Sequence, residues 1–201
     1  MKTAFTMIEL VFVIIILGIL SFSIAPSFER DNASLAFEQM KSHLELAQQL
    51  ALDNDSYIAD SRFSESAVPA VEENEAEFWF RKHPQMIITG NTYTVFSDAA
   101  NNTFNGTVDV TDVIARNPLD KTLIQDIDIE TLYGVTLAMS QCNGVQTNII
   151  AFDYLGRPHC RLTDGTNAPY ANLATAAVTI TLSENGNNRV ITIEPTTGYI
   201  H

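Results

Sequence analysis

An uninterrupted apolar run near the N-terminus constrains this chain more than any other feature. Residues 10–20 read LVFVIIILGIL, without a polar side chain, and the uncharged stretch continues to Phe28. A helix of about 20 apolar residues is long enough to cross the hydrocarbon core of a membrane. A buried core helix would fit poorly, because no face of residues 10–20 is polar. We therefore predict a transmembrane helix over residues 5–28.

A secretory signal peptide is the main alternative for this segment. Ser21, Ser23 and Ala25 loosely resemble the small residues of a signal-peptide cleavage site. Against this, an acid stands at the start of the apolar run, and residues 1–4 carry only one Lys. Lys2 before the span and two acids with one Arg after it favour a cytoplasmic N-terminus by the positive-inside rule.

Glu9 is the acid at the start of the apolar run. A carboxylate beside a membrane span is costly unless it is paired. If the chain is cut after Ala4, the new α-amine on Phe5 lies one helical turn from Glu9, where the two charges can neutralise each other. The alternative is that Glu9 only marks the interfacial end of the span.

The segment from Lys2 to Leu20, KTAFTMIELVFVIIILGIL, resembles the class III leader and N-terminal helix of type IV pilins and type II secretion pseudopilins. The resemblance implies that a prepilin peptidase removes residues 1–4, cutting between Ala4 and Phe5, and N-methylates Phe5. It also implies that Glu9 pairs with the Phe5 amine of an adjacent subunit during filament assembly. Ala4 departs from the family, which usually has Gly before the cut.

The helix is expected to continue beyond the membrane as an amphipathic segment over residues 29–52. Gly18 and Pro26 fall where pilin helices tend to carry helix-loosening residues, and Pro26 would kink or loosen the path. A separate helix after a break at residues 26–32 is the alternative. Either way, one face of the segment is apolar at helical spacing: Ala33, Phe37, Met40, Leu44, Ala47 and Ala51.

Residues 53–77 are strongly acidic and are expected to form a solvated loop. Asp53, Asp55 and Asp60 do not match the spacing of an EF-hand, so calcium is a minor alternative and we expect no other cofactor or metal. The whole chain has a formal net charge of -13, which disfavours a general nucleic-acid partner. A local basic patch at residues 81–83 keeps DNA binding open as an alternative.

Residues 78–201 show β-strand patterns and make up the expected globular domain. Gly90-Asn91 and Asn185-Gly186 predict tight hairpin turns. Further strands are expected at 78–80, 86–89, 92–96, 133–139, 148–152, 178–182 and 189–193, with a short final one at 197–200. We predict an α+β, pilin-like fold, in which the long N-terminal helix packs on a C-terminal antiparallel sheet.

Two C-terminal segments, residues 149–158 and 190–199, resemble the corresponding parts of the H-type minor pseudopilins and the FimT-like pilins. The resemblance implies a minor subunit of a type II secretion pseudopilus or a related type IV filament. Its implied partners are other subunits, the prepilin peptidase, the inner-membrane assembly platform and lipid. The implied location is the bacterial inner membrane, with a periplasmic C-terminal domain. A minor pilin for DNA uptake or adhesion and a membrane-anchored domain that never assembles are the alternatives.

Cys142 and Cys160 are the only cysteines and suffice for one disulfide. A bridge closing this loop would stabilise the fold by about 3 kcal/mol in the chain-entropy model. A metal site adding His159 to the two thiols would lack a fourth ligand.

The chain carries no recognisable catalytic motif, so we expect no enzyme. The four histidines, at 43, 83, 159 and 201, are expected at the surface.

Overall fold

The computed structural model describes residues 6–24, 31–53, 83–98, 108, 112–160 and 172–201. The chain divides into two compact units, residues 1–31 and residues 32–201, which are considered separately. In the first unit, the described residues form helix α1 (Met7–Ile24). Among the residues that the structure describes, no helix combines the length and apolarity needed to cross a membrane. The predicted span covered residues 5–28, and residues 5 and 25–28 lie outside the described part.

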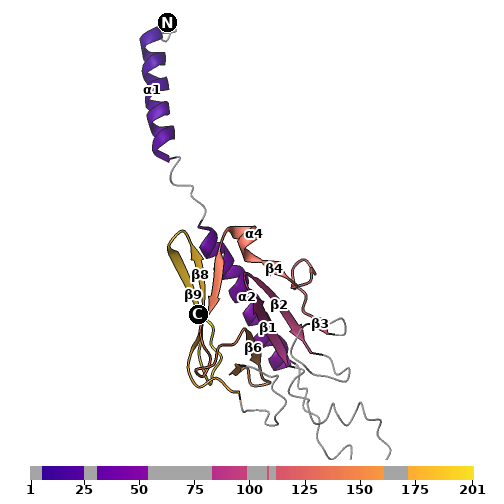
Figure 1. Cartoon of the computed structure of the whole chain (residues 1–201). Coiled ribbons are helices and arrows are strands. Elements are labelled where there is room, and N and C mark those ends of the chain that lie inside the picture. Colours follow the sequence, from indigo (N-terminus) through magenta and orange to yellow (C-terminus); the bar gives the residue numbers. More distant parts are fainter. Residues whose placement is uncertain (1–5, 25–30, 54–82, 99–107, 109–111, 161–171) are drawn as a thin grey trace, which may run out of the picture. The chain divides into compact units, whose positions relative to one another are not determined.

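The second unit begins with helix α2 (Asn32–Asp53). Asp31, directly before it, is not helical, so the described residues form two helices where the sequence favoured one continuous helix. α2 contacts β1, β2 and β6 of one sheet and β8 and β9 of another. Figure 1 shows it lying across both sheets. Both sheets therefore pack on the apolar face of α2.

The described residues after α2 form two antiparallel sheets, which confirms the expected α+β class. The larger sheet has the order β3-β2-β1-β6-β7, with β4 also paired to β2, and the smaller has the order β5-β8-β9. The strands are β1 (Pro84–Thr89), β2 (Thr92–Ser97), β3 (Val113–Ile114), β4 (Ile127–Asp128), β5 (Thr136–Met139), β6 (Ile149–Phe152), β7 (Pro158–His159), β8 (Val178–Glu184) and β9 (Asn187–Ile193).

Both predicted hairpins are confirmed. Thr89 pairs with Thr92 across Gly90-Asn91, and Glu184 pairs with Asn187 across Asn185-Gly186. The second turn places Asn185 at φ 49° and Gly186 at φ 87°, the positive values that a two-residue hairpin turn favours and that Asn and Gly adopt most easily. The expected final strand is reduced to one bridge, between Ile193 and Ile200.

The strand expected at residues 133–139 is wrong at its start. A one-turn helix, α4 (Ile129–Tyr133), precedes β5, so Tyr133 is helical. The Asp128 side chain caps this turn by accepting from the backbone N–H of Thr131. Gly134 ends the turn in a left-handed conformation, with its N–H bonded to Glu130. Asp128 lies before the range predicted as a strand, and Gly134 lies inside it, where it ends the helical turn.

The core is formed by α2 and the inner faces of both sheets. Met40 and Leu44 of α2 are fully buried, as are Ile180, Leu182 and Ile191 of the smaller sheet. The predicted stripe is confirmed, except that Phe37 is only partly buried and Ala36 joins the buried face. Because two sheets contact α2, its buried face is wider than a single apolar stripe. The predicted strand at 78–80 and most of the acidic segment 53–77 lie outside the described residues.

Candidate functional site

α1 carries Glu9, the residue for which the resemblance to pilins implies a role in assembly. Its side chains from Met7 to Leu20 include twelve large hydrophobic groups that are exposed. Glu9, the one acid of its first turn, is exposed among them, and its backbone N–H donates to the carbonyl of Thr6 at 3.1 Å. A helix that is apolar on all sides requires an apolar environment around it. The side chains of α1 therefore need an apolar partner, either lipid or protein, to shield them from water.

The remaining residues of the N-terminal prediction are only partly described. Gly18 lies inside α1, which continues as a helix to Ile24, and no neighbouring atom lies within 4 Å of the position of an added β-carbon. Ala4, Phe5 and Pro26 lie outside the described residues. The pairing of Glu9 with the Phe5 amine thus stays a prediction.

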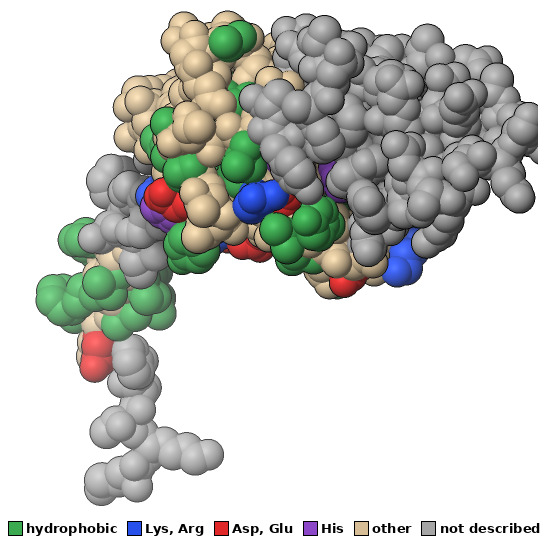
Figure 2. Space-filling view, turned by 90° about the horizontal axis from the view of Figure 1, so that it is seen from below, with side chains coloured by type: hydrophobic (Ala, Val, Ile, Leu, Met, Phe, Trp, Pro, Cys, Tyr) green, Lys and Arg blue, Asp and Glu red, His purple; other side chains and the backbone are tan. Residues whose placement is uncertain are grey.

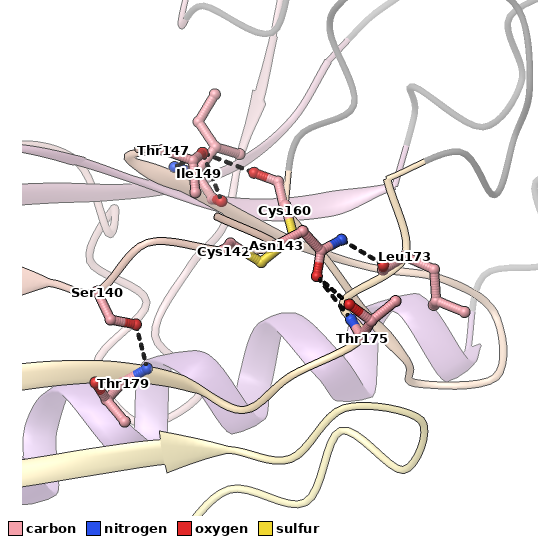
Figure 3. Close-up of a disulfide and its surroundings, with 9 residues drawn as sticks. All are labelled: Ser140, Cys142, Asn143, Thr147, Ile149, Cys160, Leu173, Thr175 and Thr179. Atoms are coloured by element: carbon pink, nitrogen blue, oxygen red, sulfur yellow. Dashed lines mark hydrogen bonds between the residues drawn. A yellow bond between two sulfur atoms is a disulfide. The ribbon is translucent and has the colours of Figure 1, made fainter. Parts of the chain in front are cut away.

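A disulfide joins Cys142 to Cys160, with the two Cα atoms 5.5 Å apart. Both cysteines are buried, and the bridge ties the connection between β5 and β6 to the end of β7. Polar contacts surround it (Figure 3): the Thr147 hydroxyl donates to the Cys160 carbonyl at 2.6 Å, and the Asn143 side chain contacts Leu173 and Thr175. The bridge therefore holds together a region of short, irregular segments.

A buried carboxylate organises the turn between β6 and β7. Asp153 accepts hydrogen bonds from the backbone N–H groups of Leu155 and Arg157 and from the Arg157 guanidinium at 2.8 Å. Nε2 of His159 lies 3.3 Å from the same carboxylate. Burial raises the pKa of Asp153, but the hydrogen bonds from His159 and Arg157 outweigh it and hold the pKa well below its usual range. With its oxygens fully engaged in this way, Asp153 stabilises the turn and is poorly placed to act as a catalytic base.

Three of the four histidines contradict the surface prediction. His43, His83 and His159 are buried, and only His201 is exposed. Tyr93, 50 positions away along the chain, compensates the burial of His43, and Asp153, only 6 positions away, compensates the burial of His159. For His43, the sequence offered one local indication of burial: it directly precedes Leu44 of the apolar stripe and so lies at the edge of the buried face of α2.

The described residues hold no group of three or more His, Cys, Asp or Glu side chains suited to a metal ion. Asp53, the first acid of the predicted loop, ends α2, whereas Asp55 and Asp60 lie outside the described part. The basic residues 81 and 82 also lie outside it, and His83 is buried. On the face shown in Figure 2, acidic and basic side chains lie interspersed among hydrophobic ones.

Comparisons with family models, with curated proteins and with solved structures found no match for this chain.

Proposed function

We propose that this chain is a minor subunit of a type II secretion pseudopilus or a related type IV filament, without enzymatic activity of its own. The proposal is supported mainly by the composition of α1 and by the folded unit that follows it. α1 is a helix with apolar side chains on all sides and one acid, Glu9, in its first turn, followed by a separately folded α+β unit. An assembling subunit needs both parts, because the helix packs among copies of itself while the folded domain remains in water.

In this proposal, residues 5–28 lie in the inner membrane before assembly, and the domain from residue 32 onward is periplasmic. The Cys142–Cys160 disulfide supports the location, because such bridges persist in oxidising compartments. The prepilin peptidase cuts between Ala4 and Phe5 and methylates the Phe5 amine. In the filament, that amine neutralises Glu9 of a neighbouring subunit, since either charge alone is heavily penalised in an apolar environment.

Intact mass and N-terminal sequencing of the membrane-extracted protein test processing directly. The proposal expects the mature chain to begin at Phe5 and to carry one additional methyl group. A working protein that retains residues 1–4 would instead be a membrane-anchored domain that never assembles.

Substitution of Glu9 tests assembly separately from processing. We expect Glu9→Gln to leave membrane insertion intact and to reduce incorporation into sheared filaments at least tenfold, because the buried amine loses its counter-charge. Glu38→Gln is the matched control, since it removes the same charge from an exposed position of α2. Equal incorporation of both variants would contradict the role assigned to Glu9.

A further inference from the structure

The smaller sheet ends in β9, a seven-residue strand that has a strand partner, β8, on one side (Figure 1). Its ladder with β8 is regular and continuous, from Asn187 paired with Glu184 to Ile193 paired with Val178. Natural proteins usually protect such an edge with a bulge, a proline, several charged side chains or a covering segment. The sequence of β9 contains no proline, and its single charged residue is Arg189. A covering segment is therefore the remaining form of protection.

A covering segment occupies one end of this edge. The backbones of Thr192 and His201 exchange two hydrogen bonds, at 2.8 and 3.0 Å. Because alternate residues of a strand direct their backbone groups to the same side, the N–H and C=O groups of Val190 and Asn188 also point away from β8. Within the described part of the chain, no backbone group pairs with Val190 or Asn188 on this side. Both residues are exposed, so this stretch of the edge is open.

The other edge strands are covered or very short. In β5, the N–H of Leu137 donates to the side chain of Asn91 at 3.0 Å. β7 is covered by residues 172–174, where the N–H of Ala174 donates to the carbonyl of Pro158 at 2.9 Å. β3 and β4 are only two residues long. Among the described edge strands, β9 thus combines the longest regular ladder with an open outer edge.

The side chains beside the open edge are small and uncharged on the face of the sheet that points away from α2. Two cross-strand rows reach the edge on this face: Ala138–Thr181–Val190 and Thr136–Ser183–Asn188. All six side chains are exposed or half-buried, whereas the alternate residues of β8 and β9 lie in the core on α2. A further strand would extend both rows, and small β-branched side chains pack best beside such neighbours.

We propose that the open edge of β9 binds an extended segment of another protein by β-strand addition, with small uncharged side chains on the face away from α2. The segment exchanges backbone hydrogen bonds with Asn188 and Val190. Unpaired N–H and C=O groups at strand spacing are complemented by another extended backbone, which supplies both kinds of group at the same spacing. This proposal is independent of the filament role.

A second copy of this chain is a less suitable occupant. The antiparallel register that pairs Asn188 of each copy with Val190 of the other places the two Arg189 side chains directly opposite each other. Like charges in directly opposed positions destabilise a strand pair. An extended segment from a different protein avoids this repulsion.

Amide hydrogen exchange of the full chain in mild detergent, followed by NMR, tests whether the edge is open. The N–H groups of Asn188 and Val190 should exchange at least about tenfold faster than those of Arg189 and Ile191, which face β8. Slow exchange of Val190 would show that the edge is already covered and would overturn the proposal. Protection of Val190 that increases with protein concentration would assign the edge to a second copy and would also overturn it.

The binding probe is a capped pentapeptide of alternating threonine and valine, in which each valine carries an N-methyl group. The methyl groups block one edge of the peptide, which prevents it from stacking into sheets and leaves the threonine N–H groups free for β9. We expect the Asn188 and Val190 amide resonances to shift saturably, with a dissociation constant on the order of 1 mM. The same peptide with N-methyl groups on its threonines as well should bind at least about tenfold more weakly, because it has no donor for β9.

Two variants at one position assign the binding to β9. Val190→Pro removes an outward N–H and leaves the ladder with β8, because proline is tolerated on an edge strand where its nitrogen faces outward. Followed at the Asn188 amide, it should weaken probe binding roughly tenfold, whereas Val190→Thr, which keeps the N–H and the β-branched shape, should not change it. Slow exchange of the Ile191 N–H checks that β9 stays paired with β8 in both variants.

Three results of the binding experiments would overturn the proposal. The first is equal binding of the two methylated peptides, a comparison that does not depend on the folding of any variant. The second is the absence of a saturable shift up to about 10 mM probe, roughly ten times the expected constant. The third is unchanged binding by a Val190→Pro variant whose β9 remains paired with β8.

Discussion

The backbone of Gly198 lies directly against the carbonyl oxygen of Gly156, with no room for a β-carbon between them. Gly156 belongs to the turn between β6 and β7, and Gly198 to the segment after β9. The side-chain amide of Gln48 in α2 donates to the carbonyl oxygens of both glycines, at 2.8 and 2.9 Å. Three segments that are far apart in the sequence thus meet at one point.

Gly198→Ala should destabilise the domain by about 2 to 4 kcal/mol. Gly198 has φ 66°, which an alanine adopts only with strain, and the added methyl group would overlap the Gly156 carbonyl. Gly186→Ala is the control, because Gly186 also has a positive φ but no atom near the added methyl. Urea unfolding should show the smaller loss, about 1 kcal/mol, for the control. Equal losses would mean that the contact with Gly156 is unimportant.

Gln48→Ala should lower the free energy of unfolding by about 1 to 3 kcal/mol. The substitution leaves the partly buried carbonyl oxygens of Gly156 and Gly198 without their side-chain donor. Gln49→Ala, at the neighbouring exposed position of α2, should change the stability by less than about 0.5 kcal/mol. Thermal unfolding of both variants under identical conditions measures the difference, and similar melting temperatures would refute the role of Gln48.

Loss of the disulfide should destabilise the domain by about 3 kcal/mol. The purified protein should contain no free thiol before reduction, because Cys142 and Cys160 are joined. Adding a reductant should lower the melting temperature of the unmodified protein. It should leave that of the double variant Cys142→Ala/Cys160→Ala unchanged, and a matching shift in both proteins would assign the effect to something other than the bridge.

The domain should lose stability in acid through Asp153. The pKa of this carboxyl is lower in the folded than in the unfolded protein, so its contribution is complete above the unfolded value and is lost as the pH falls toward the folded value. The difference in unfolding free energy between the unmodified protein and Asp153→Asn should therefore be largest near neutral pH and shrink below about pH 4. A difference that does not depend on pH would show that the charge of Asp153 is irrelevant.

The elements that sequence analysis predicted well depend on local patterns. The hairpins at Gly90-Asn91 and Asn185-Gly186 follow from residues that tolerate positive φ between apolar strands. The inner face of α2 follows from apolar spacing within one helix. α4 was missed because a single turn has too few residues to show a period, and its evidence lies in two caps, Asp128 and Gly134.

By itself, the sequence determined the two hairpins and the inner face of α2, which helix is apolar on all sides, and that Glu9 stands at the start of that helix. Only the tertiary structure decided that His43 is buried and that Gln48 joins two turns. The physical reason is that burial of a polar group depends on a compensating partner. For His43 that partner is 50 positions away, and for Gln48 the partners are 108 and 150 positions away. No pattern within one segment carries that information.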